Sequence, residues 1–308
     1  MVATFINNIK YRFSTASMPM KIIYINIAVF LALRIAGIIC FFAGIDSHLF
    51  LRWIEAPSSA YDALYAPWTI ITYMFAHYDI MHILFNMLML YWFGTLFLNY
   101  FTPKQFVALY LIGGIGGWIL YTLAFAFLPV LQGVSSLLIG ASASVMAIVI
   151  ALAIKAPHYR IGLLFLGDIP LKWIAIGYIV IDLLSITGNN MGGHLAHLGG
   201  AFAGAIFATL LSRGTDITKP LNNFIDYLTN FKDSFKLSSF KKKNTFSHNS
   251  SKKSNKNYNE TQSHQPSGKM SKEDEATLDI ILDKIKQSGY SSLTQGEKKR
   301  LFQVSNKK

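Results

Sequence analysis

The sequence predicts an all-α polytopic membrane protein with six transmembrane helices. Of its 308 residues, 52% are hydrophobic and only 14% are charged, and this charged share is well below that of an ordinary soluble domain. Apolar segments of about 17 to 24 residues recur along the chain, which is the helix length needed to cross the hydrocarbon core of a bilayer. These two observations exclude a soluble globular fold for residues 22–212.

The six predicted spans follow one another along the chain. The first, residues 22–44, is too long for a signal-peptide core and lacks a small-residue cleavage site after it, so we expect it to stay in the mature protein. Cys40 lies in this span and is the only cysteine, so the sequence predicts no intramolecular disulfide and no cysteine-based metal site. The other spans are predicted at residues 81–99, 105–128, 137–154, 170–186 and 194–212.

The distribution of charge orients these helices. The N-terminal segment, residues 1–21, carries Lys10, Arg12 and Lys21 and no acidic residue, and the region after the fourth span is also basic. Lys and Arg are enriched on the cytoplasmic side of membrane proteins. We therefore expect both termini in the cytoplasm of a bacterium and the helices in its plasma membrane.

The composition changes beyond the last span. Residues 213–269 are expected to form a flexible basic linker, because residues 236–269 are too poor in apolar side chains to compensate for the entropy lost on ordering. Anionic lipid of the cytoplasmic leaflet is the expected partner of its lysines, and nucleic acid is not. Residues 270–308 are predicted to form a small helical hairpin without an assigned role, in which Thr294 and Glu297 form a capping box.

Five polar residues share one depth in three of the predicted spans. Each requires a reason, because an unpaired polar group is costly in hydrocarbon. The second, fourth and sixth spans run in the same direction, so residues early in each lie within about two turns of the same membrane face. The set comprises His82 and Asn86 in the second span, Ser142 in the fourth, and His194 and His197 in the sixth.

Residue types within this set match the needs of acyl transfer. Ser142 and His197 can act as nucleophile and general base, because imidazole can accept the hydroxyl proton as the oxygen attacks a carbonyl. His82 and Asn86 are four residues apart, hence on one helical face, and both can donate hydrogen bonds. Such donors can stabilise the oxyanion that develops during the attack.

Small residues accompany the proposed nucleophile and base. Gly200 and Gly204 follow His197 on one face of the sixth span, and alanines recur every four residues after Ser142. Stripes of small residues let membrane helices pack with close backbones. The short Ser and His side chains need this close approach in order to meet.

At these residues the chain resembles the rhomboid family of intramembrane serine proteases. The stretches "GASAS", "AHLGGAFAG" and "HILFN" are similar to that family's G-x-S, A-H-x-x-G-x-x-x-G and H-x-x-x-N motifs, and they occur in family order within residues 22–212. The resemblance implies a six-helix rhomboid-like protease domain over this range. It implies that Ser142 and His197 form a catalytic dyad without an aspartate, and that Asn86, His82 and the Ser142 amide form the oxyanion hole.

The resemblance also assigns Gly140 to the turn that opens the fourth helix. It implies no cofactor, and it implies substrates that are cleaved in or next to their own transmembrane segments. The chain departs from the family at three places. Ala143 stands where the family often has glycine, Met146 where many members have an aromatic residue, and Trp68 is followed by Thr69 where many members have arginine.

Two other functions remain open. The histidines at positions 77, 82, 194 and 197 can in principle hold zinc or haem iron in a membrane metal protein. That interpretation leaves Ser142 and Asn86 unexplained. The other is a rhomboid-like binding protein without catalysis, against which the presence of both dyad residues speaks. The sequence does not indicate an oligomeric state.

Four further polar residues receive structural interpretations. Ser144 is expected to bond its own helix backbone, and His194 to have a structural or supporting role. His77 is expected to cap or be solvated near the outer interface. Arg34, in the first span, is expected to pair with a bundle acid such as Asp182 or to reach water along the helix.

Overall fold

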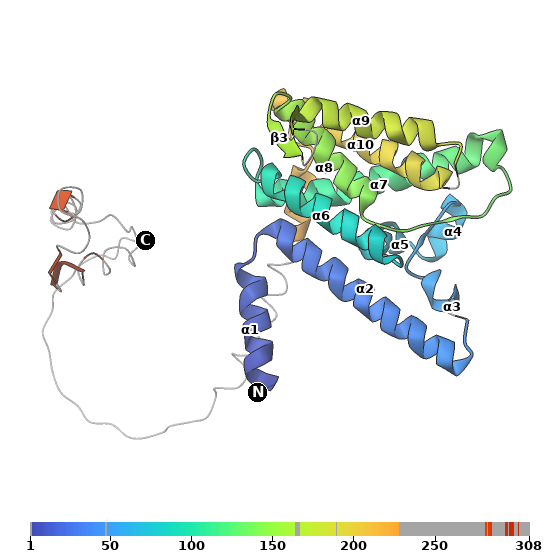
Figure 1. Ribbon diagram of the computed structural model, residues 1–308, viewed down its shortest axis with the longest axis horizontal. Helices are drawn as coiled ribbons and strands as arrows, with labels where there is room; N and C mark the ends of the chain where they lie inside the picture. Colours follow the sequence, from blue (N-terminus) through green and yellow to red (C-terminus); the bar gives the residue numbers. More distant parts are fainter. Residues whose placement is uncertain are drawn as a thin grey trace, which may run out of the picture. The chain divides into compact units, whose positions relative to one another are not determined.

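The computed structural model describes residues 2–46, 48–163, 167–188 and 190–227, together with single residues and short stretches between 281 and 301. The chain divides into two compact units, residues 1–244 and 245–308, and each is described by itself. The first unit is a bundle made mainly of helices (Figure 1). The greater part of the predicted linker, residues 228–269, lies outside the described residues.

Six long helices of the first unit correspond in order to the predicted spans. By length and composition, four of them can cross a membrane, namely α2, α6, α7 and α10, and α8 is apolar but shorter. The fold is therefore mostly helical and of the membrane class, and the count of six spans stays a prediction. The six helices are α2 (Met18–Ala43), α6 (Ile80–Phe97), α7 (Pro103–Phe127), α8 (Ser142–Lys155), α9 (Leu171–Ser185) and α10 (Met191–Ser212).

Helix α8 begins later than the sequence predicts. Residues Leu137–Leu138 form a strand, β2, that pairs antiparallel with β1 (Ala56–Pro57), so they are not part of the helix. Gly140 then has a φ of +113°, a conformation that side chains other than hydrogen disfavour. Ser142 is consequently the first residue of α8. The rest of the helix is almost wholly buried, and α8 is the central helix of the bundle.

Several short elements were not predicted. The α2–α6 connection contains α3 (His48–Leu51), α4 (Ala60–Tyr65), α5 (Thr69–Thr72) and the 3-10 turn η1 (Tyr73–Phe75). Elsewhere, α1 (Val2–Thr15) precedes α2, η2 (Pro129–Leu131) follows α7, and β3 (Arg160–Leu163) and β4 (Gly167–Pro170) form a hairpin between α8 and α9. Most of these pieces are too short to show a hydrophobic period in the sequence. The β1–β2 pair has a clear role, because it joins the first loop to the turn before Ser142.

Glycines bring α7, α8 and α10 into backbone contact. A Cβ atom on Gly200 would overlap the carbonyl oxygen of Ala143, and one on Gly204 would overlap that of Ala147. A Cβ on Gly117 of α7 would lie 2.6 Å from the Cβ of Ala143. Because no side chain separates these backbones, the contacts fix the position of α8 along α10.

Helix α2 packs against the bundle mainly through its first half. Pro19 contacts α6 at Gly94, where an added Cβ would lie 2.8 Å from the proline Cβ. Asn26 is fully buried and donates a hydrogen bond of 2.9 Å to the Ile22 carbonyl. Arg34, in the second half, is exposed and forms no ion pair within the described part of the chain. Its expected partner, Asp182, is bonded elsewhere.

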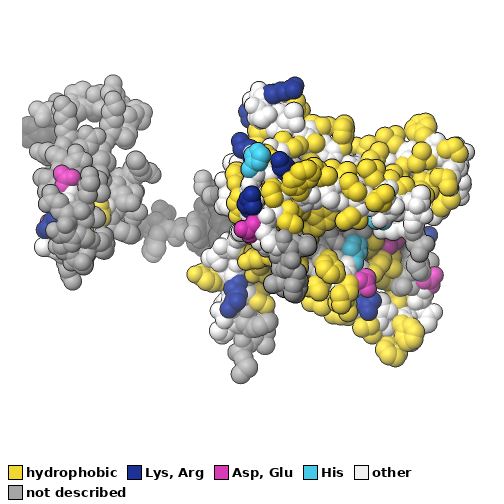
Figure 2. Space-filling model, turned by 45° about the horizontal axis from the view of Figure 1, so that its top comes forward, with side chains coloured by type: hydrophobic (Ala, Val, Ile, Leu, Met, Phe, Trp, Pro, Cys, Tyr) yellow, Lys and Arg dark blue, Asp and Glu magenta, His cyan; other side chains and the backbone are white. Residues whose placement is uncertain are grey.

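Apolar and basic side chains occupy different parts of the surface. Hydrophobic side chains cover much of the face of the first unit seen in Figure 2, as expected of a bundle that contacts lipid. Lys155 ends α8 and Lys172 lies in the first turn of α9, so both belong to the end of the bundle opposite Ser142. A helix of 14 residues separates the two ends of α8 by about 21 Å.

The predicted linker is packed at its start. Asp216 Oδ2 accepts a hydrogen bond of 2.9 Å from Gln105 Nε2 in the first turn of α7, and Thr218 is fully buried. Only residues 236–269 of the predicted linker are poor in apolar side chains, and this short stretch precedes them. The segment that follows α10 therefore belongs, through residue 227, to the packed part of the first unit.

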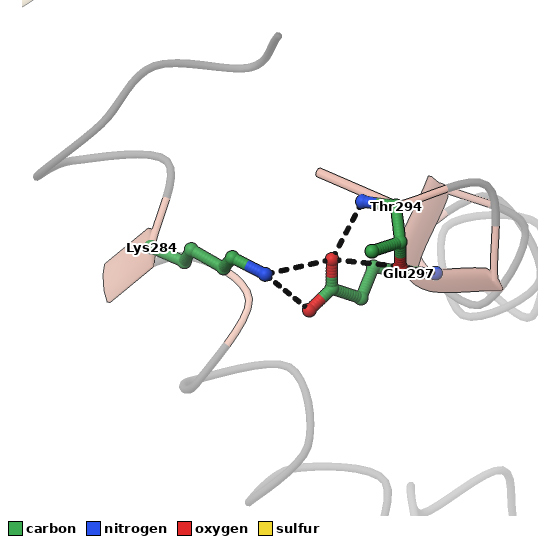
Figure 3. A network of polar contacts seen from close by, with 3 residues as sticks. All are labelled: Lys284, Thr294 and Glu297. Atoms are coloured by element: carbon green, nitrogen blue, oxygen red, sulfur yellow. Dashed lines mark hydrogen bonds and ion pairs between the residues drawn. The ribbon is translucent and has the colours of Figure 1, made fainter. Parts of the chain in front are cut away.

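The capping box predicted near the C-terminus is present in the second unit. Glu297 Oε2 accepts hydrogen bonds from the Thr294 amide at 2.7 Å and hydroxyl at 2.9 Å, and the Glu297 amide donates to the Thr294 hydroxyl at 3.4 Å. Lys284 donates to both carboxylate oxygens, as Figure 3 shows. Lys284 and Thr294 together lower the pKa of Glu297 to about 2. Leu278, Leu282, Ile285 and Gly289 of the predicted hairpin lie outside the described residues.

The glycine contacts lead to a stability prediction. Gly204→Ala is expected to destabilise the protein by about 1–3 kcal/mol, because the added methyl group meets the α8 backbone, which cannot rotate away. Gly37→Ala in α2 is the matched control, since nothing lies within 4 Å of its Cβ position. Thermal unfolding in detergent, followed by circular dichroism, measures both. Equal unfolding temperatures for the two variants would contradict the proposed backbone contact.

Candidate active site

A cavity of about 620 Å³ opens between five helices of the bundle. Its lining combines apolar residues with a few polar ones, as is usual for ligand sites. The cavity lies at the end of the bundle where α6, α8 and α10 begin. Its polar and sulfur-containing lining side chains include His82, Asn86 and Met89 of α6, Ser142 and Met146 of α8, Tyr178 and Asp182 of α9, and His197 of α10.

Ser142 occupies the N-terminus of α8. Ser142 lines the cavity, and no hydrogen bond joins its hydroxyl directly to His197 among the described residues. The first amides of a helix have no carbonyl partners within it, and the positive end of the helix dipole favours an anion there. Ser144 is fully buried and does not line the cavity, and its hydroxyl has no hydrogen-bond partner in the described part of the chain, so the expected bond to its helix backbone is not made.

The turn before Ser142 is held by the first loop. The Gly140 amide donates to the Tyr73 carbonyl at 2.9 Å, and the Ala141 amide donates to His77 Nε2 at 3.3 Å. Burial, followed by the nearby His82, lowers the pKa of His77 to about 3, so its ring is neutral and can accept this bond. His77 is fully buried, so it is not solvated, and its bond to the Ala141 amide agrees with the capping option that the sequence left open.

His82 and Asn86 lie beside the same turn. The His82 ring packs directly on Gly140, where an added Cβ would lie 2.6 Å from ring atom Cε1. Asn86 Nδ2 donates one hydrogen bond of 3.0 Å to the His82 carbonyl, and a second hydrogen remains on that nitrogen. Asp79 accepts from the His82 amide at 2.8 Å and caps α6. These contacts hold two potential donors next to Ser142.

His197 contacts an acidic residue that the sequence analysis did not assign to the site. Its Nδ1 lies 2.9 Å from Asp182 Oδ1, and His194 Nδ1 lies 2.8 Å from the same oxygen. Asp182 thus adjoins the residue expected to act as the base of a dyad, and it is not paired with Arg34. The one signal in the sequence was an acid within an otherwise apolar span, which requires a buried partner.

The same three residues form the group best able to hold a metal among the described residues. One ligand atom from each of Asp182, His194 and His197 lies within 4.8 Å of the others, and nitrogen and carboxylate donors suit zinc. The four-histidine set considered from the sequence is not gathered in this way. The His77 ring contacts that of His82, and the His194 ring contacts that of His197.

Comparison with known proteins identifies the fold family. Residues 65–214 match the family described as Rhomboid domain. This segment is a domain of the rhomboid family. Residues 269–307 match a second family, described only as a family of unknown function (DUF6576). The rhomboid match contains α6 to α10, the five helices that surround or adjoin the cavity.

Three relatives represent the similar proteins. RHOMBOID-like protein 12, mitochondrial, of Arabidopsis thaliana is 34% identical over 47% of this chain and 47% of its own length. Presenilin-associated rhomboid-like protein A, mitochondrial, of Danio rerio is 32% identical over 42% of this chain and 34% of its own. The presenilin-associated rhomboid-like protein, mitochondrial, of Homo sapiens is 29% identical over 44% and 35%. The chain thus spans between a third and a half of the length of these relatives.

The names of the relatives contradict the predicted location. A bacterial plasma membrane was expected, with both termini in the cytoplasm, but the relatives are named mitochondrial proteins. The prediction was wrong because charge bias distinguishes the two sides of a membrane and carries no information on which membrane it is. The basic end of the bundle, with Lys155 and Lys172, still lies opposite Ser142.

The Asp182 cluster leads to a prediction about metal content. We expect the purified protein to carry no stoichiometric zinc, because hydrogen bonds to Asp182 already occupy both Nδ1 atoms. Mass spectrometric metal analysis before and after chelation checks this, with His194→Ala as the matched variant. One ion per chain in the native protein, lost in His194→Ala, would favour the metal-protein alternative.

Proposed function

We propose that the protein is an intramembrane serine protease that hydrolyses peptide bonds in or next to the transmembrane segments of membrane proteins. One observation carries the proposal. A single cavity is lined by a serine at a helix N-terminus, a histidine from a second helix, and two donors from a third. Nucleophile, base and oxyanion donors are the three groups that acyl transfer requires.

Each residue has a distinct role in this proposal. Ser142 Oγ attacks the scissile carbonyl carbon, and His197 takes the hydroxyl proton and later gives it to the leaving amine. Asn86, His82 and the Ser142 amide donate hydrogen bonds to the resulting oxyanion. Gly140 allows the close approach of His82, and Gly200 and Gly204 hold α10 against α8. No cofactor enters these steps.

Membrane proteins are the proposed substrates and partners. Six spans, including the shorter α8 and α9, are proposed to enclose the cavity, so that a substrate reaches it from within the bilayer. Several relatives are named presenilin-associated, which supports partners that are themselves membrane proteins. Their names also support a mitochondrial membrane as the location of this chain. The basic residues 236–269 are proposed to bind anionic lipid headgroups.

Two alternatives are distinguished by specific observations. A rhomboid-like binding protein without activity is the main one, because the names of the relatives do not mention proteolysis. The presence of Ser142 and His197 in one cavity favours the enzyme. A membrane zinc protein would use Asp182, His194 and His197 and would give Asn86 no task.

The proposed dyad predicts the loss of activity in two variants. Ser142→Ala and His197→Ala are each expected to abolish cleavage of a transmembrane substrate in detergent, because they remove the nucleophile and its base. Ser144→Ala is the matched control, since Ser144 lies two residues away and is buried outside the cavity. A fluorophosphonate probe followed by peptide mass spectrometry should label Ser142. Full cleavage by Ser142→Ala would refute the proposed function.

The proposed oxyanion hole predicts a loss of rate rather than of fold. Asn86→Ala is expected to slow turnover by about 10²-fold or more, because one preorganised donor contributes about 3 kcal/mol in the transition state. Asn99→Ala, at the exposed far end of the same α6 region, should leave the rate unchanged. Turnover per folded molecule is the quantity to compare. If Asn86→Ala unfolds while its folded fraction keeps full activity, Asn86 is structural.

A further inference from the structure

A buried carboxylate lies directly behind the proposed base. Asp182 of α9 is only 4% exposed, and its Oδ1 is the oxygen approached by Nδ1 of both His194 and His197. An ionised carboxylate accepts hydrogen bonds and donates none. Each of the two imidazole rings therefore carries a hydrogen on Nδ1 and donates it to Asp182.

This contact determines which atom of His197 is free to act as a base. A neutral imidazole with hydrogen on Nδ1 has its lone pair on Nε2. The His197 side chain also lines the cavity that contains Ser142, so the lone pair is available on the side of the ring away from Asp182. Without the carboxylate, the ring can adopt the other tautomer, in which Nε2 carries the hydrogen and accepts no proton.

His194 accounts for the presence of an acid at this depth. A carboxylate within a membrane span is costly unless hydrogen bonds or ion pairs compensate for the lost water. His194 lies about one turn before His197 and donates to the same oxygen. No lysine or arginine forms an ion pair with Asp182 among the described residues. Among the described residues, the carboxylate beside His197 is therefore held by two imidazole N–H donors.

We propose that Asp182 is a positioning residue of this protease that sets the tautomer of His197 and stabilises its protonated form. The proposal rests on the function proposed above. As Ser142 Oγ bonds to the carbonyl carbon, its proton moves to His197 Nε2 and the carbonyl electron pair moves to the oxygen. When the carbon–nitrogen bond breaks, His197 returns the proton to the leaving amine. Asp182 keeps its charge and the Nδ1 hydrogen bond throughout, and His194 holds the carboxylate in place.

The test compares two aspartates that make similar hydrogen bonds at opposite ends of the bundle. Asp182→Asn removes the charge beside His197 and keeps the side-chain volume. Asp216→Asn makes the same change where the carboxylate accepts from Gln105 and Thr218 and touches no part of the cavity. Purified full-length variants are assayed in detergent on one quenched transmembrane substrate, and kcat, KM and the thermal unfolding temperature are measured for each.

Asp182→Asn is expected to lower kcat by about 10²- to 10⁴-fold with little change in KM, because it weakens the base and leaves substrate binding alone. Asp216→Asn should affect the unfolding temperature and leave kcat per folded molecule unchanged. His194→Ala should lower kcat by less than about tenfold, since His197 still reaches Asp182.

Two results would overturn the role of Asp182. One is a kcat for folded Asp182→Asn within about threefold of the native value, and the other is a loss of activity that follows only the loss of folded protein. Failure of the protease function itself looks different. In that case the native chain does not cleave the substrate, or Ser142→Ala cleaves it equally well, whatever the substitution at position 182.

Discussion

The arrangement of the whole site depends on the contact between the backbone of α8 and the glycine face of α10. Gly200 and Gly204 leave no room for a side chain between the two helices. The helix that carries Ser142 and the helix that carries His197 therefore cannot slide past each other without backbone overlap. Glycines of α7 allow equally close contacts of that helix with α8 and α10. In lipid, where no hydrophobic force draws one apolar helix to another, close packing of this kind supplies much of the attraction between helices. The depth shared by the serine and the histidine is thus a consequence of steric contact.

A second constraint is the cost of polar groups in a membrane interior, and the cluster around Asp182 satisfies it with imidazole N–H donors. Two imidazole rings donate to one carboxylate oxygen, which is less compensation than a lysine or arginine would give. In the proposed acyl transfer, this carboxylate would therefore act electrostatically on the imidazole ring that becomes positive. On the opposite side of the cavity, His77 is neutral because it is buried, and it serves the turn before Ser142 as an acceptor. Histidines of the same protein thus have different tasks set by their surroundings.

Much of this organisation can be predicted from the sequence, and the parts that cannot share a physical cause. The long helices follow from apolar length, and the capping box at Thr294 follows from local hydrogen-bond chemistry that involves four consecutive residues. Gly140, Gly200 and Gly204 were identified because motifs with fixed spacing contain them. The apolar span placed the start of α8 at residue 137, because the pairing of β1 with β2 joins segments about 80 residues apart, and only the resemblance assigned Gly140 to the turn before the helix. The contacts of Asp182 and His77 were missed for the same reason, since no local pattern records which distant backbone or ring a buried polar group will meet.

The shortness of α8 has a consequence for the membrane around the protein. At about 1.5 Å per residue, its 14 residues span roughly 21 Å, whereas the neighbouring α7 and α10, with 25 and 22 residues, span about 37 and 33 Å. A hydrocarbon layer near 30 Å thick matches the two outer helices and exceeds the central one. Ala143 contacts Gly117 and Gly200, which lie well inside α7 and α10, so Ser142 lies beneath the level at which α7 ends and α10 begins. Hydrophobic mismatch of this kind is relieved when the bilayer thins locally. The thickness of the surrounding lipid therefore influences how far a neighbouring transmembrane helix must tilt before its backbone reaches the depth of Ser142.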